Sequence, residues 1–107
     1  MNSQFVERRR HKRITVDKSV LNNPEFTAND LSESGMQLSC ATEQRKGRKI
    51  DITLNLEGQT VPLKAEIMWC RKASSVYETG YHVGVQFIEY SVSHELLIRD
   101  FVDKKSE

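Results

Sequence analysis

Alternating apolar and polar residues run through most of the chain and predict short β-strands. The most regular stretch covers residues 50–56, where Ile50, Ile52, Leu54 and Leu56 alternate with polar residues. This period of two is typical of a strand that buries one face. A similar alternation is present in residues 14–16, 25–29, 36–40, 61–71 and 80–88. We therefore expect six short strands.

Turn residues separate these strands at intervals of about ten residues. The turn signals are Asn22-Asn23-Pro24, Glu57-Gly58-Gln59 and the polar stretch 30–35, which ends in a glycine able to adopt positive φ. Short strands joined in this way predict a small antiparallel β-barrel. Such a barrel is filled by its own side chains, so a ligand would bind on its outer surface or rim.

The period of the pattern changes near the end of the chain, where the apolar residues follow helical spacing. These residues are Val92, Leu96, Leu97, Ile98, Phe101 and Val102. Ser91 or Ser93 is placed to cap this helix, and Lys104 and Lys105 suit the negative end of its dipole. The predicted fold is therefore mostly β: a small six-stranded antiparallel β-barrel with a C-terminal α-helix that covers an opening or an edge.

Length and composition indicate one small soluble domain. The chain has 107 residues, of which 37% are hydrophobic and 29% charged. No apolar run approaches the roughly 20 residues that cross a bilayer, and the N-terminus lacks a signal peptide, so we expect no membrane insertion and a cytoplasmic location. In that compartment Cys40 and Cys70 are expected to be reduced thiols, although they could pair under oxidising conditions.

Positive charge is concentrated near the N-terminus. Residues 7–13 contain five cations and one carboxylate, whereas the whole chain has a net charge of +1. Four of the cations are arginines, whose planar donors match phosphate oxygens and the N7/O6 edge of guanine. A basic run of this kind is also typical of a solvated tail or a general nucleic-acid patch. We expect residues 1–13 to form a flexible arm and residues 14–107 to form the barrel and helix.

Two short motifs resemble the signature of a known family. Arg9 and Arg13 form an RxxxR pattern, and Asp30, Ser32 and Gly35 form a DxSxxG pattern. In this order and spacing they resemble the PilZ domain, a family of bacterial cyclic di-GMP receptors. The stretch 84–87, Gly-Val-Gln-Phe, is similar to a strand near the end of such domains. The resemblance covers nearly the whole chain, from about Glu7 to the closing helix.

The resemblance implies a role for each motif residue in binding cyclic di-GMP, which carries two phosphates and two guanines. Arg9 and Arg13 would bind phosphate oxygens or a guanine edge. Asp30 would accept hydrogen bonds from guanine N1–H and N2–H₂. Ser32 would bond a phosphate or the loop backbone, and Gly35 would allow the chain to approach closely.

Three further residues belong to the expected site. Arg8, directly before RxxxR, resembles family members that bind two mutually intercalated nucleotides, and it therefore implies a dimeric ligand. Trp69 and Arg71 form a W-x-R pattern similar to residues beside the ligand in several members. Two interpretations of Trp69 remain open, because its alternation with Ile67 also fits a core aromatic.

The leading prediction is a non-enzymatic cyclic di-GMP receptor. Within the sequence we find no nucleophile paired with a base and no glycine-rich phosphate loop, and His82 and His94 lack the partners of a metal site. Ligand binding would order the arm and change a surface that a downstream protein reads, in motility, polysaccharide synthesis or transcription. The alternative is a barrel that binds single-stranded nucleic acid through its basic stretches, although the low net charge argues against it.

Overall fold

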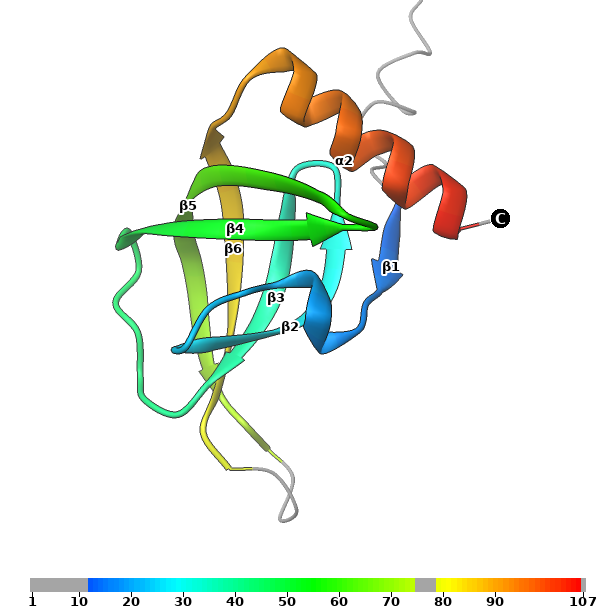
Figure 1. The fold of residues 1–107 in the computed structure, drawn as a ribbon. Coiled ribbons are helices and arrows are strands. Elements are labelled where there is room, and N and C mark those ends of the chain that lie inside the picture. Colours follow the sequence, from blue (N-terminus) through cyan, green and yellow to red (C-terminus); the bar gives the residue numbers. More distant parts are fainter. Residues whose placement is uncertain (1–11, 75–78, 107) are drawn as a thin grey trace, which may run out of the picture.

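The computed structural model describes residues 12–74 and 79–106, which form a mostly β fold (Figure 1). Its elements in chain order are β1 (Arg13–Thr15), the 3₁₀-helix η1 (Lys18–Val20), β2 (Phe26–Ser32), β3 (Gly35–Cys40), β4 (Lys49–Leu56), β5 (Gln59–Lys72), β6 (Tyr81–Glu89) and α2 (Val92–Lys105). The predicted six strands and C-terminal helix are thus confirmed, with strand ends displaced by up to three residues.

The six strands form one antiparallel sheet in the order β1-β2-β3-β6-β5-β4. The sheet curls into a half-barrel, so that its two edge strands, β1 and β4, approach each other (Figure 1). The segment after η1 joins the edges through an isolated bridge between Leu21 and Leu54. Beyond this bridge the seam between the edges stays unpaired within the described residues.

Apolar side chains from every strand fill the interior, which leaves no room for a ligand there. Leu31, Leu38, Leu54, Val61, Ala65, Ile67 and Val83 are all fully buried. Helix α2 lies across one end of the half-barrel, where it contacts β1, β2, β4 and β5 and buries Ile98 and Val102 (Figure 1). Its N-cap is Ser91, whose hydroxyl accepts a hydrogen bond from the backbone N–H of His94. The expectation of a helix covering the barrel opening is confirmed.

The β4–β5 hairpin follows the predicted alternation without interruption. Its pairs run continuously from Lys49 opposite Glu66 to Leu56 opposite Gln59, and burial in β4 alternates as expected. Its turn residue Gly58 has a φ of 90°, which is the left-handed region that a glycine favours.

Pairing elsewhere in the sheet is interrupted by bulges that change which side chains face outward. On β2 the extra residue is Asn29, between Ala28 and Asp30; on β5 it is Met68, between Ile67 and Trp69. An extra residue reverses the alternation of side chains beyond it. Of the two interpretations of Trp69, the core aromatic that shares the face of Ile67 is therefore wrong, because Trp69 pairs with Gly84 on the outer face.

The stretch expected to be a loop is mostly strand. β2 continues through Ser32 and β3 begins at Gly35, so that the turn consists of Glu33 and Ser34 alone. Gly35 does not adopt positive φ, which corrects the turn chemistry expected from the sequence. It is a glycine because β3 and β6 approach closely: a Cβ on Gly35 would collide with the carbonyl oxygen of Val85.

Both cysteines are free thiols in the structure; Cys40 is buried and Cys70 is half-buried. Burial raises the pKa of the Cys40 thiol. Within residues 12–74 and 79–106, no helix combines the length and the apolar character that a membrane crossing requires.

Candidate functional site

A row of four residues crosses the outer face of the sheet. Asp30 on β2 pairs with Gln37 on β3, Gln37 pairs with Gly84 on β6, and Gly84 pairs with Trp69 on β5. Cross-strand partners point to the same side of a sheet, so these four residues form one outer row. The bulges at Asn29 and Met68 directly precede the two ends of this row. They bring Asp30 and Trp69 to one face of the molecule.

The two sequence motifs meet at one end of the outer row. The Nη1 atom of Arg13 donates a hydrogen bond of 2.7 Å to Oδ1 of Asp30. β1 positions Arg13 by pairing it with Ser32, two residues beyond Asp30 on β2. The Arg13 side chain is still 45% exposed, so it can contact a ligand as well. Arg8 and Arg9 lie outside the described residues, and their roles stay predictions.

A second donor fixes the Asp30 carboxylate in place. The backbone N–H of Gln37 donates to the same Oδ1 atom at 2.7 Å. Charge-assisted bonds of this length hold a carboxylate in one orientation, which prepares it to accept further donors. Gln37 was not predicted as a site residue, although its outward position in the 36–40 alternation was a usable signal.

Ser32 and Gly35 shape the turn that follows Asp30. The Ser32 hydroxyl is fully buried; it accepts from the backbone N–H groups of Ser34 and Gly35 and donates to the Gly35 carbonyl, at 3.2–3.3 Å. The Ser34 carbonyl in turn accepts from the N–H of Phe87 at 2.9 Å, which ties the turn to β6. The sequence predicted that Ser32 would bond either a phosphate or the loop backbone, and the structure contains the bonds to loop backbone.

At the other end of the outer row, Trp69 and Arg71 stand together. Trp69 is half-buried and Arg71 is exposed, with the guanidinium carbon 4.5 Å from the centroid of the indole ring. They border a hollow of about 290 Å³ on the outer surface. The hollow is lined by Gln37, Trp69, Arg71, Lys72, Ser74 and His82. Its cations and its aromatic ring are suited to an anionic ligand with flat bases.

A second line of polar side chains runs beside the outer row. Asn29 donates from its amide to the Ser39 hydroxyl at 2.8 Å, and the Ser39 hydroxyl lies 3.3 Å from Nδ1 of His82. His82 pairs with Arg71 across β5 and β6. The bulge residue Asn29 is thus itself part of the polar surface between the two ends of the site.

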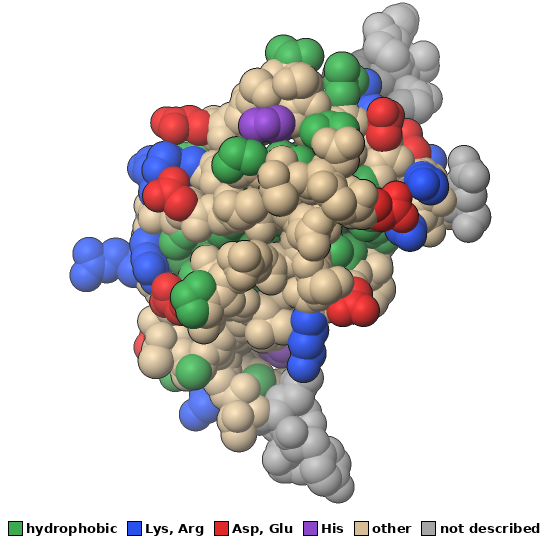
Figure 2. All heavy atoms as spheres, viewed as in Figure 1, with side chains coloured by type: hydrophobic (Ala, Val, Ile, Leu, Met, Phe, Trp, Pro, Cys, Tyr) green, Lys and Arg blue, Asp and Glu red, His purple; other side chains and the backbone are tan. Residues whose placement is uncertain are grey.

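Ion pairs offset the negative charge close to the motif. Glu33, in the motif turn, pairs with Arg99 of α2 at 3.0 Å, and this carboxylate raises the pKa of Arg99. Figure 2 shows acidic and basic side chains side by side on the face drawn, without a continuous basic surface there. The face drawn therefore offers no continuous basic track for a long phosphate backbone.

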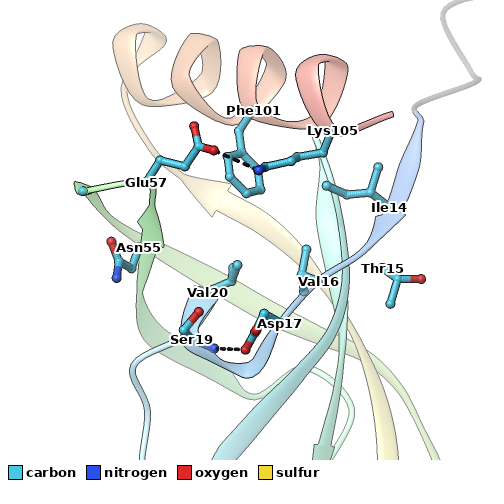
Figure 3. Close-up of a pocket in the computed structure, with 11 residues that line it drawn as sticks. Ile14, Thr15, Val16, Asp17, Ser19, Val20, Asn55, Glu57, Phe101 and Lys105 are labelled. Atoms are coloured by element: carbon cyan, nitrogen blue, oxygen red, sulfur yellow. Dashed lines mark hydrogen bonds and ion pairs between the residues drawn. The ribbon is translucent and has the colours of Figure 1, made fainter. Parts of the chain in front are cut away.

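A larger pocket of about 470 Å³ lies in the open part of the seam between β1 and β4 (Figure 3). Phe101 and Lys105 project into it from α2, and Lys105 pairs with Glu57 at 2.8 Å. None of the predicted site residues lines it. Its charged lining residues are Asp17, Glu57 and Lys105, and the last two pair with each other, so the pocket offers an anionic ligand no unpaired cation among its lining residues.

No group of three or more His, Cys, Asp or Glu side chains within the described residues is placed to hold a metal ion. The arrangement offers recognition groups: a fixed carboxylate, exposed guanidiniums and a flat ring. These groups can bind a charged nucleotide through hydrogen bonds and stacking.

Comparison with known proteins identifies the family of this chain. The family model described as PilZ domain matches residues 7–104. The chain belongs to the PilZ domain family. PilZ domains are known as cyclic di-GMP receptors and not as enzymes. No curated protein matches this chain in sequence.

Two solved structures share the PilZ fold of this chain. The first is Bacillus subtilis inhibitor of motility (MotI/DgrA), with a TM-score of 0.74 and 13% identity over 92% of this chain. This chain spans about half of that one, 51% of its length. The second is the PilZ domain with cyclic di-GMP of YcgR from Escherichia coli, with a TM-score of 0.69 and 17% identity, covering 91% of this chain and 90% of that one.

Proposed function

We propose that this PilZ domain binds cyclic di-GMP on the outer row and on the arm that precedes β1. The observation that carries the proposal is the 2.7 Å bond between Arg13 and Asp30, which joins the RxxxR and DxSxxG motifs in space. Arg9 and Arg13 bind phosphate oxygens or a guanine edge, and Asp30 accepts from guanine N1–H and N2–H₂. Ser32 and Gly35 support this contact by shaping the turn.

The width of the site suits a ligand with two bases. Asp30 and Trp69 are separated by three strand spacings, about 14 Å at ~4.8 Å each. A nucleotide can therefore contact Asp30 and Arg13 at one end and the hollow beside Trp69 and Arg71 at the other. Arg8 adds charge for a second, intercalated nucleotide, so we expect two ligand molecules per chain.

Ligand contacts to Arg8 and Arg9 would hold the arm against the outer row; the arm ends one residue earlier than expected, at residue 12, because Arg13 belongs to β1. This would change the surface charge near α2, where Lys12 pairs with Asp103 at 3.4 Å. A downstream protein reads the changed surface, so the domain acts as a receptor without a reaction of its own.

Calorimetric titration with cyclic di-GMP tests this proposal. We expect tight binding with two nucleotides per chain, lost in Arg9→Ala, Arg13→Ala and Asp30→Ala. Arg45→Ala, in the exposed basic turn before β4, is the matched control and should bind normally. Absence of heat with the unaltered chain would overturn the proposal. Length-dependent binding of a single-stranded oligonucleotide, lost in Arg45→Ala, would instead support the nucleic-acid alternative.

A further inference from the structure

The seam between β1 and β4 presents backbone groups of both edge strands. The N–H of Val16 donates to β2 at 3.2 Å, and successive residues of a strand direct these groups to opposite edges, so those of Thr15 face the seam. On β4 the Thr53 carbonyl accepts from the N–H of Asn22 at 3.3 Å, so the groups of Asn55, two residues further on, face the same way. No described strand lies between the two edges here. Unpaired edges of this kind are where a further strand can add.

The pocket of about 470 Å³ between these edges, the seam pocket, has an apolar floor. Its apolar lining residues are Ile14, Val16, Val20 and Phe101. Phe101 reaches the seam pocket from α2, opposite Val16 and Val20 (Figure 3). Val16 and Phe101 are only partly buried, so an added apolar side chain would cover surface that the fold leaves exposed.

The charged groups that line the seam pocket already have partners. Glu57 pairs with Lys105 at 2.8 Å and with Lys104 at 3.1 Å. The Asp17 carboxylate accepts from the backbone N–H of Ser19 at 3.0 Å. What the seam pocket leaves open is therefore apolar surface and strand backbone. An extended polypeptide segment with an apolar side chain uses both.

The chain's own arm starts beside the seam pocket. Residues 1–11 lie outside the described part of the chain, and the residue after them, Lys12, leads directly into β1, one wall of the pocket. The Nζ atom of Lys12 pairs with Asp103 at 3.4 Å, so the arm joins the barrel next to α2. Eleven residues reach at most about 36 Å when extended, so the pocket is within reach. Phe5 and Val6 are adjacent apolar residues of this stretch, and residues 8–11 leave enough chain for a reversal, since hairpin loops take about two to five residues.

We propose that residues 4–7 occupy the seam as a short strand antiparallel to β1 when no ligand is bound. Phe5 packs on Val20 and Phe101 in the seam pocket, and Val6 faces solvent, because neighbouring side chains of a strand point to opposite sides. The backbone of this strand bonds the Thr15 groups that face the seam. The occupant of the seam is thus the arm of the same chain.

Docking in the seam and ligand binding draw the arm in opposite directions. The seam lies along one edge of β1, whereas Arg13 meets Asp30 beside the other edge, where β2 pairs. Arg8 and Arg9 reach the outer row when the arm leaves the seam, so the docked arm competes with cyclic di-GMP. This competition rests on the proposed function, whereas the docking itself does not.

Hydrogen exchange of the ligand-free chain tests the docking. The Thr15 N–H should exchange at least about ten-fold more slowly in the unaltered chain than in Phe5→Ser, which removes the side chain that holds the strand. Val6→Ser makes a similar change at the neighbouring position that faces solvent, so this matched control should exchange like the unaltered chain. Nuclear Overhauser contacts between the rings of Phe5 and Phe101 should accompany the protection. Equal exchange of Thr15 in the unaltered chain and in Phe5→Ser, without such contacts, would overturn the inference.

A dilution series separates the chain's own arm from the arm of a second copy. Protection of the Thr15 N–H should not depend on protein concentration. Protection that is lost on dilution, together with a dimer in sedimentation, would place the arm of a second copy in the seam and overturn the intramolecular assignment. Thermal unfolding shows that each variant is folded.

Calorimetric titration tests the competition. Phe5→Ser should bind cyclic di-GMP about three-fold or more tightly than the unaltered chain, because no fraction of the arm is then held in the seam. Val6→Ser should bind like the unaltered chain. Unchanged affinity in Phe5→Ser would overturn the competition. If the unaltered chain does not bind cyclic di-GMP, the proposed function fails, and the exchange of Thr15 still decides whether the arm docks.

Discussion

In the β4–β5 hairpin eight consecutive residue pairs follow each other without interruption, whereas the pairing of β2 with β3 and of β5 with β6 is broken beside the candidate site. Regular alternation in the hairpin sends every second side chain into the core. The bulges turn Asp30 and Trp69 outward. Without them, Asp30 would point inward like Ala28, and Trp69 would point inward like Ile67, because each lies two residues after that buried residue. The comparison teaches that regular pairing builds the interior of this domain and that two of the departures from it, at Asn29 and Met68, turn the candidate site residues outward.

The largest expected effect lies in the regular region. Leu54 is fully buried on β4, so Leu54→Ala should lower the free energy of unfolding by about 2–5 kcal/mol through the cavity it creates. Urea unfolding measures this loss, with the exposed neighbour Asn55→Ala as the control. Affinity for cyclic di-GMP should be unchanged in the folded protein. A large loss of affinity would mean that the two regions are not separable.

A smaller loss is expected where β3 approaches β6. Gly35→Ala places a methyl group against the backbone carbonyl of Val85, which cannot turn aside, so we expect a loss of stability of about 3 kcal/mol. Gly58→Ala is the control, because its Cβ would meet open space and only its positive φ adds strain, about 1 kcal/mol. If Gly35→Ala and Gly58→Ala lower the free energy of unfolding equally in denaturant titrations, the close approach of β3 and β6 is not the cause of the loss.

Ser32 is the residue at which the motif turn can be weakened and its two expected uses, a phosphate contact and a bond to loop backbone, can be told apart. Ser32→Ala removes a buried acceptor from the N–H groups of Ser34 and Gly35, so we expect a loss of about 2 kcal/mol. Ser19→Ala, at an exposed serine outside this turn, is the control and should cost far less stability. Chemical denaturation together with ligand titration tests this. Loss of binding at unchanged stability would instead assign Ser32 a direct ligand contact.

The smallest effect concerns the ion pair between Glu25 and Arg48, which joins the two regions. Glu25 directly precedes β2, and Arg48 directly precedes β4. A hydrogen bond from Arg48 lowers the pKa of Glu25, so the pair stabilises the fold above the unfolded-state pKa of about 4.3 and loses this contribution as the pH falls through the lowered value. Both side chains are more than 40% exposed, which limits the contribution to below about 1 kcal/mol.

Glu25→Gln should therefore reduce stability at pH 7 and have a smaller effect near pH 3. Urea unfolding at the two pH values measures the difference. An equal effect at both pH values would show that the charge of Glu25 does not carry the contribution.

The sequence predicted the strands, the helix and the two motifs because each depends on local pattern, whereas the bond between Arg13 and Asp30 joins residues 17 apart and was not predicted. Alternation with period two locates the strands, and helical spacing locates the helix. The short motifs indicate which residue types belong to the candidate site. The outward orientation of Trp69 could not be predicted, since a bulge at Met68 arises from pairing with β6 and leaves no mark in the alternation of residues 61–71. Gln37 was missed although the alternation of residues 36–40 places its side chain outward; what residue type does not reveal is its contact with Asp30, which a backbone N–H makes.

Each bulge contains one more residue than the partner strand needs, as if one codon had been inserted into the strand. An added residue would ordinarily carry every later side chain to the opposite face, but the bulge absorbs it at a single position. Loss of codon 68 would leave Trp69 next to Ile67 and opposite Gly84 in an unbroken ladder, still facing outward. The outer row therefore tolerates a change of one residue in strand length, and the distance along the chain from the motifs to Trp69 is not a fixed property of the site.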